Sequence, residues 1–103
     1  MELKELEYIV AVAEERSISK AADRLYLAQS SLSQFVSRYE AELGVKLFKR
    51  TSGGVRPTTA GELFLRNARQ MLLQYHQVRQ QLTDLIAQLN LRIAAYGAQS
   101  GAQ

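Results

Sequence analysis

The 103-residue sequence contains no cysteine, and that absence removes several kinds of chemistry at once. Without thiols the chain cannot form disulfides, zinc ribbons, iron–sulfur ligation or a thiolate nucleophile. Its single histidine, His76, has no obvious carboxylate or nucleophile partner and is most simply an exposed residue. No glycine loop is followed by the Lys-Ser or Lys-Thr pair of a phosphate-binding loop. We therefore expect no enzyme, no metal site and no cofactor.

Long hydrophobic runs are also missing. The N-terminus, "MELKELEYIV", is acidic and amphipathic, so it is neither a signal peptide nor a membrane span. With 47% hydrophobic and 22% charged residues, the composition is typical of a soluble globular protein, and we expect it in the cytoplasm without a membrane partner. A core of this size is thin, so a second subunit would supply burial that the monomer lacks.

Charge is unevenly distributed along the chain. Residues 1–15 contain one lysine and five glutamates, whereas residues 16–56 contain eight basic and three acidic residues. Such segregation indicates a surface for a polyanion, although a charge excess alone more often marks a solvated face.

Apolar spacing predicts three helices in the first half of the chain. The first covers residues 3–15, and Ser17 or Ser19 can cap a short alanine-rich second helix, "KAADRLY". The third covers residues 29–43. Two short helices, a tight turn and a third helix are typical of a helix-turn-helix.

A small hairpin is predicted next, in "VKLFKRTSGGVRPTT". Val45 and Leu47 begin an extended run, "TSGG" forms the turn, and the only proline, Pro57, ends the second strand. Thr58 is a candidate cap for the following helix, and Thr59 with Glu62 offers an alternative capping box. Its basic residues favour a DNA-contacting wing over a merely solvated hairpin.

From Thr59 to Asn90 only Gly61 interrupts a long predicted helix. Apolar residues recur there in alternating steps of four and three, a heptad seam that needs a second helix to bury it. We expect a homodimer, with parallel and antiparallel pairing both open. The predicted dimer interface comprises Tyr75, Val78, Leu82, Leu85 and Leu89. The tail, "LRIAAYGAQSGAQ", begins like a short strand.

In a helix-turn-helix the third helix lies in the DNA major groove and its first residues face base edges. Amides pair with adenine and hydroxyls bind at short range, so the predicted base contacts are Gln29, Ser30, Ser31, Ser33 and Gln34. The predicted backbone or wing contacts are Lys20, Arg24, Ser37, Arg38, Lys49, Arg50, Ser52, Gly53, Gly54 and Arg56. For any one of these residues a solvated surface is the more frequent explanation, and it is the set that favours DNA.

The order and spacing of "AVAEERSISKAADRL", "SQFVSRYEAELGVKLFKR" and Thr58 to Gly61 resemble the N-terminal DNA-binding domain of LysR-type transcriptional regulators. The resemblance covers residues 1 to about 90. It implies a mainly α fold: a winged helix-turn-helix of three helices and a two-stranded β wing (1–58), then a long dimerisation helix (59–90). Residues 91–103 would be the truncated, flexible start of an absent effector-binding domain. The chain would then bind double-stranded DNA at an inverted repeat and contain no small-molecule effector site.

Three positions depart from the family pattern. Ala28 stands where a capping Ser or Thr is usual, Ser30 replaces a proline, and Pro57 replaces a leucine. Loss of the cap should cost about 1 kcal/mol of helix stability. An alternative function is a dimerisation or protein-interaction module in which the long helix acts and the winged domain is a passive scaffold.

Overall fold

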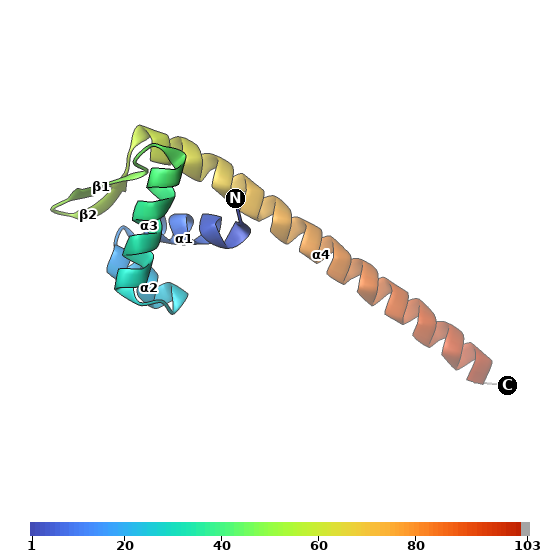
Figure 1. Ribbon diagram of the computed structural model, residues 1–103. Coiled ribbons are helices and arrows are strands. Elements are labelled where there is room, and N and C mark those ends of the chain that lie inside the picture. The colour runs from blue at the N-terminus through green and yellow to red at the C-terminus, as the bar shows by residue number, and fades with distance from the viewer. Residues whose placement is uncertain (102–103) are drawn as a thin grey trace. The chain divides into compact units, whose positions relative to one another are not determined.

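The computed structural model describes the backbone of residues 1–101 and the side chains of residues 1–97. It is mainly helical, with one two-stranded sheet between the third and fourth helices (Figure 1). The chain divides into two units, residues 1–72 and the part from Leu73 onward. In order, the elements are α1 (Leu3–Glu15), α2 (Ile18–Leu25), α3 (Gln29–Leu43), β1 (Phe48–Thr51), β2 (Gly54–Pro57) and α4 (Thr59–Gly101).

Local capping explains where α1 and α2 begin and end. The Glu2 N–H donates to the Glu5 carboxylate at 2.8 Å at the start of α1, and Arg16 closes that helix in the left-handed conformation. The Ser17 hydroxyl accepts from the Lys20 N–H at 3.1 Å. Ser17 is therefore the cap of α2, which begins at Ile18, earlier than the "KAADRLY" stretch predicted from the sequence.

The core of the first unit joins α1, α2, α3 and the first turns of α4. Its most buried large side chains are Leu6, Ile9, Val12, Leu32 and Leu47. Ala21 and Ala22 are also buried, and their small side chains let α2 pack closely on its neighbours. Burying each large aliphatic side chain contributes about 1.5–3 kcal/mol relative to leaving it exposed.

A row of aromatic rings connects three of these helices. Tyr8 of α1 meets Phe35 of α3 edge to face, with ring centroids 5.3 Å apart. Phe35 stacks on Tyr39 at 5.3 Å, and Tyr39 meets Phe64 of α4 edge to face at 5.8 Å. The first turns of α4 are therefore packed on the same core as the helix-turn-helix.

The two strands form an antiparallel hairpin, residues 48–57, which we call the wing. Its register pairs Phe48 with Pro57 at the base and Thr51 with Gly54 at the turn, so Pro57 ends the second strand as predicted. The expected extended run at Val45 and Leu47 is not part of a strand, because β1 begins only at Phe48. The Leu47 N–H donates to the Glu40 carboxylate instead of to a neighbouring strand.

Helix α4 begins at Thr59 and is longer than the sequence predicts. The Thr58 hydroxyl accepts from the Gly61 N–H at 3.0 Å, so Thr58 is its cap. The expected strand from Leu91 is wrong, because the described residues 91–101 continue the helix to Gly101. A lone strand would have no mate, whereas leucine, arginine and alanine are good helix formers. Within the described residues, no helix has the length and hydropathy needed to cross a bilayer.

Candidate nucleic-acid interface

Helix α3 starts without a side-chain cap. Ala28 holds the extended conformation of an N-cap residue (φ −68°, ψ 141°), but its methyl group cannot accept a hydrogen bond. The first N–H groups of a helix have no partner within the helix. The beginning of α3 therefore presents backbone donors together with the polar side chains that follow.

The polar and apolar sides of α3 separate as the sequence predicts. Leu32, Val36 and Tyr39 are buried against the core. The predicted base contacts lie on the other side: Gln29, Ser30, Ser31 and Gln34 are exposed and Ser33 is half-buried. The structure thus brings all five to the accessible start of one helix.

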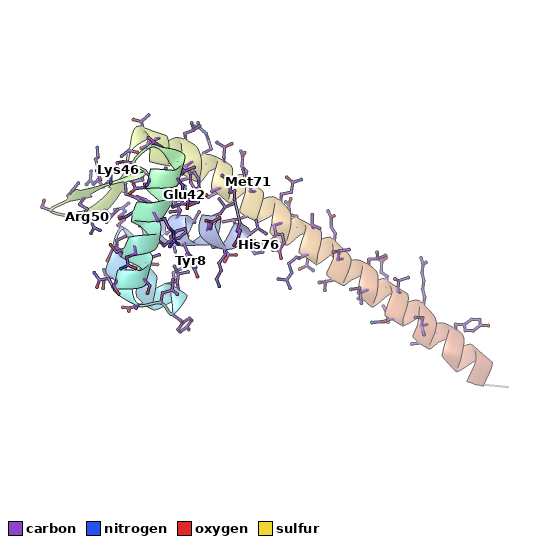
Figure 2. All side chains as sticks on the ribbon, viewed as in Figure 1. Tyr8, Glu42, Lys46, Arg50, Met71 and His76 are labelled. Atoms are coloured by element: carbon purple, nitrogen blue, oxygen red, sulfur yellow. The ribbon has the colours of Figure 1, made fainter. Side chains whose placement is uncertain are left out.

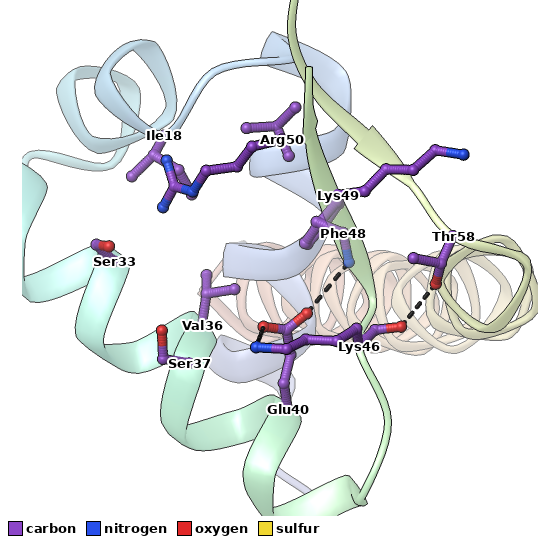
Figure 3. Close-up of a pocket in the computed structure, with 11 residues that line it drawn as sticks. Ile18, Ser33, Val36, Ser37, Glu40, Lys46, Phe48, Lys49, Arg50 and Thr58 are labelled. Carbon is purple, nitrogen blue, oxygen red and sulfur yellow. Dashed lines mark hydrogen bonds and ion pairs between the residues drawn. The ribbon is translucent and has the colours of Figure 1, made fainter.

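The cleft between α3 and the wing measures about 510 Å³. Ser33 and Ser37 line it from α3, and Lys46 and Arg50 line it from the wing and the segment before it. Figure 3 shows both serines facing the wing across this cleft. Glu40 also lines this cleft, and its Oε1 lies 3.9 Å from the Lys46 Nζ, so Lys46 already has an acidic partner. The two serine hydroxyls and Arg50 suit the oxygens of a phosphodiester backbone.

The wing arginine nearest to α3 also reaches the start of that helix. Arg50 points toward Ile18, whereas Lys49 points away from α3 (Figure 3). Ser17, Ser19, Gln29 and Arg50 line a second cleft of about 230 Å³. One predicted base contact and one predicted wing contact therefore share a cleft.

A buried carboxylate fixes the wing to α3. Glu40 is 7% exposed, and its Oε2 accepts from the N–H groups of Leu47 at 2.6 Å and Phe48 at 3.2 Å. The Thr58 hydroxyl donates to the Lys46 carbonyl at 2.6 Å and so ties the two ends of the wing together. Sequence reasoning missed Glu40, although its place four residues after Val36 on the apolar face of α3 marked it as an unusual acid.

The wing also rests on the turn between α1 and α2. The Val55 N–H donates to the Arg16 carbonyl at 3.0 Å. Gly54 has φ 119°, and a side chain there would overlap that same carbonyl oxygen. Gly54 therefore serves this close approach, while Ser52 and Gly53 are exposed at the tip.

The predicted backbone contacts on α2 and α3 differ in their surroundings. Lys20, Ser37 and Arg38 are exposed, and Lys20 and Arg38 carry cations. Arg24 instead binds the carboxylates of Glu14 and Glu15 at 3.1 and 3.2 Å. The hydrogen bond to Glu14, and to a smaller extent the one to Glu15, raises the pKa of Arg24 above its ordinary value. A phosphate would have to compete with α1 for this guanidinium.

The predicted heptad seam lies in the second unit, on α4. Its five side chains, Tyr75, Val78, Leu82, Leu85 and Leu89, are between 40% and 53% exposed. Ile86 and Ile93 widen the exposed apolar face, and Tyr96 continues it, although sequence reasoning did not include them. Side chains project from α4 along its length (Figure 2). His76 is exposed, as predicted.

Comparison with known sequences identifies relatives of this chain. Residues 3–62 match the family model described as bacterial regulatory helix-turn-helix protein, lysR family. The chain is 49% identical over 77 residues to the HTH-type transcriptional regulator AlsR of Bacillus subtilis, a stretch covering 75% of this chain and 26% of AlsR. It is 39% identical over 99 residues to ClcR of Pseudomonas putida, covering 94% of this chain and 34% of ClcR.

Solved structures give the same answer. The BenM_DBD/benA site 1 DNA complex matches with a TM-score of 0.77 and 40% identity, covering 82% of this chain and 99% of that one. CbnR, a LysR family transcriptional regulator, matches with a TM-score of 0.72 and 36% identity, and the match covers 79% of this chain and 28% of the CbnR chain. The chain spans about a quarter to a third of the length of the curated relatives. With its helix-turn-helix, wing and long helix, the chain belongs to the lysR family of bacterial regulatory helix-turn-helix proteins.

Proposed function

We propose that this chain is the DNA-binding and dimerisation portion of a transcriptional regulator. The observation that carries the proposal is the uncapped start of α3, where polar side chains are exposed beside a cleft lined by cations from the wing. Similarity to the BenM_DBD/benA site 1 DNA complex supports it, because that match covers almost the whole of the DNA-bound chain. Helix α3 would enter the major groove and the wing would contact the minor groove or backbone.

Base recognition is assigned to the first turns of α3. Gln29 and Gln34 each offer a carbonyl and an amide, the pair of groups that binds adenine bidentately. Ser30, Ser31 and Ser33 can donate or accept at short range. Exposure of the amides and of the first two serines supports this assignment.

Backbone binding is assigned to the surrounding cations and small residues. They are Lys20, Ser37, Arg38, Lys49, Arg50, Ser52, Gly53, Gly54 and Arg56, with Arg24 contributing only if it leaves its glutamate partners. Contacts of this kind fix the position of a protein on DNA without selecting sequence.

The seam on α4 is assigned to a homodimer. Five apolar side chains at heptad spacing are about half exposed, and a second copy of the helix would bury them. A two-fold dimer presents two recognition helices, so an inverted repeat is the expected target. The comparisons support this function over a protein-interaction module with a passive winged domain.

Two further assignments follow from the family. Its members are regulators, so we assign no catalytic role to this chain. A regulator of bacterial transcription acts where the chromosome lies, so the proposed location is the cytoplasm. We assign no effector site to residues 1–97.

Titration of the protein against pooled genomic DNA fragments at 50 and 200 mM salt tests DNA binding. If the protein makes about six phosphate contacts, we expect affinity to fall by about 1,000-fold between the two salt concentrations. Selection from a random DNA pool should then return an inverted repeat. Binding that is absent, or that does not respond to salt, would count against the proposal.

Base recognition is tested by Gln29→Ala on the selected site. We expect a loss of about 1–3 kcal/mol in binding free energy and a relaxed preference at one base position in each half-site. Gln70→Ala, the same change at an exposed position of α4, is the control and should bind as the wild type does. If Gln29→Ala lost the same binding free energy on selected and on random DNA, Gln29 would contact the DNA backbone and not a base.

A further inference from the structure

The face of the wing that points away from α3 carries a second group of cations. Arg16, Lys49 and Arg56 line a cleft of about 440 Å³ between the wing and the end of α1, together with the single acid Glu62. Lys49 points away from α3 in Figure 3. Lys49 and Val55 line both this cleft and the one beside α3, whereas Ser33 and Ser37 do not line this one.

The strand register places two of these cations directly opposite each other. Lys49 pairs with Arg56 across the antiparallel ladder. Like charges in directly opposed positions destabilise a sheet. None of the ion pairs among the described residues includes Lys49, Arg56 or Arg16, although Glu62 lines the same cleft. An anion bound in this cleft, beside Lys49, Arg56 and Arg16, would relieve this repulsion.

The backbone of Arg16 is fixed beside the cleft by its conformation and by its contacts with the wing. Its φ of 56° is the left-handed conformation, which costs a non-glycine residue about 1–2 kcal/mol. Its carbonyl accepts from Val55 and lies against Gly54. A glycine would satisfy the same backbone without strain, so the backbone alone does not account for an arginine here. Strained residues that persist tend to lie at functional positions.

On the basis of the proposed function, we propose that Arg16 binds a DNA phosphate together with Lys49 and Arg56. The wing then contacts the backbone from both of its faces: Arg50 on the side of α3, and this cluster on the other side. A phosphate contact carries no sequence information, so Arg16 contributes to affinity and salt dependence but not to base preference. Glu62, as the acid in the cleft, opposes the same phosphate.

The test separates binding from folding because glycine suits the backbone of Arg16. Arg16→Gly should unfold at the same or a higher denaturant concentration than the wild type, yet bind DNA more weakly. For the loss of one phosphate contact per protomer, the slope of log affinity against log salt should become shallower by about 0.9. The affinity deficit should then be about threefold larger at 50 mM than at 200 mM salt for each protomer. Arg16→Lys retains the charge and should recover most of the affinity.

Two controls fix the sign and the place of the effect. Glu62→Gln should strengthen binding, whereas Glu7→Gln, on the exposed side of α1, should not. Arg69→Ala removes an exposed cation of α4 and should leave the salt slope unchanged. Wild-type protein that binds DNA with salt dependence while Arg16→Gly binds equally well would overturn the role of Arg16 alone. Wild-type protein that does not bind would overturn the proposed function and this inference with it.

Discussion

Two adjacent residues on α3 bury polar groups with opposite consequences. The Glu40 Oε2 accepts two backbone N–H groups at the start of the wing, and its Oε1 lies 3.9 Å from the Lys46 Nζ. Tyr39 is 5% exposed, and its hydroxyl has no hydrogen-bond partner among the described residues. Hydrogen bonds to a charged group contribute about 1.5–3 kcal/mol, whereas an unsatisfied buried group costs about 1–3 kcal/mol. Glu40 therefore stabilises the wing, while the Tyr39 hydroxyl destabilises the core.

We predict that Tyr39→Phe stabilises the protein by about 1 kcal/mol, because it keeps the ring between Phe35 and Phe64 and removes the unpaired hydroxyl. Burial, reinforced by Glu5 and Glu42, raises the pKa of Tyr39 above its ordinary value of about 10. The unfolded chain therefore loses this proton first. Ionisation of Tyr39 therefore leaves the free energy of unfolding unchanged below about pH 10 and lowers it as the pH rises further.

Urea denaturation at pH 7 and at pH 11 checks both parts of this prediction. Tyr39→Phe should have the higher midpoint at pH 7 and should lose less stability at pH 11. Tyr26→Phe is the matched control, since Tyr26 is 96% exposed and should affect neither measurement. A lower midpoint for Tyr39→Phe at pH 7 would mean that its hydroxyl is satisfied in solution.

At the scale of elements, the helices differ in whether a side chain caps their first turn. Both α2 and α4 begin at a hydroxyl, Ser17 and Thr58, that accepts from the first turn. Helix α3 begins at Ala28, which accepts nothing through its side chain. The helix proposed to enter the groove is thus the one whose first-turn donors remain available.

We predict that Ala28→Ser stabilises the domain by about 1 kcal/mol, because a serine hydroxyl can accept from the first turn of α3. The extended backbone of Ala28 already suits a capping residue. Ala41→Ser is the control, since the same change within α3 should cost about 0.5 kcal/mol of helix propensity. Thermal or urea unfolding of both variants provides the measurement. Equal changes in stability at the two positions would contradict the claim that α3 lacks a stabilising cap at Ala28.

The elements that followed from the sequence are those with a strong local pattern. Apolar spacing predicted α1 and α3 at their observed bounds, and glycines predicted the turn of the wing. Features that depend on distant residues were not predictable. The pairing of Arg24 with α1 and the bonds from Glu40 to the wing join residues that are seven or more positions apart. The tail begins like a short strand, but a strand depends on neighbours to pair with, and residues 91–101 continue α4 instead.

At the scale of the whole molecule, two parts with different tasks share one helix. The winged unit contains its own core and the proposed DNA surface, whereas the second unit exposes an apolar seam that nothing within its own helix can bury. Each winged unit alone would bind a half-site weakly. Linking two of them converts the second binding event into an intramolecular one and raises the overall affinity by about 100-fold or more.

Dimerisation and tight DNA binding should therefore be lost together. Leu82→Glu places a charge in the middle of the seam, where burial of the leucine would contribute about 1.5–3 kcal/mol per copy. We expect a monomer by analytical ultracentrifugation and an affinity for two half-sites reduced by about 100-fold, with single half-site affinity unchanged. Gln77→Glu adds the same charge off the seam and should leave both the dimer and its DNA affinity intact. If Leu82→Glu remained dimeric, the dimer interface would have to lie outside the seam. If it were a monomer that bound two half-sites as tightly as the wild type, tight DNA binding would not depend on dimerisation.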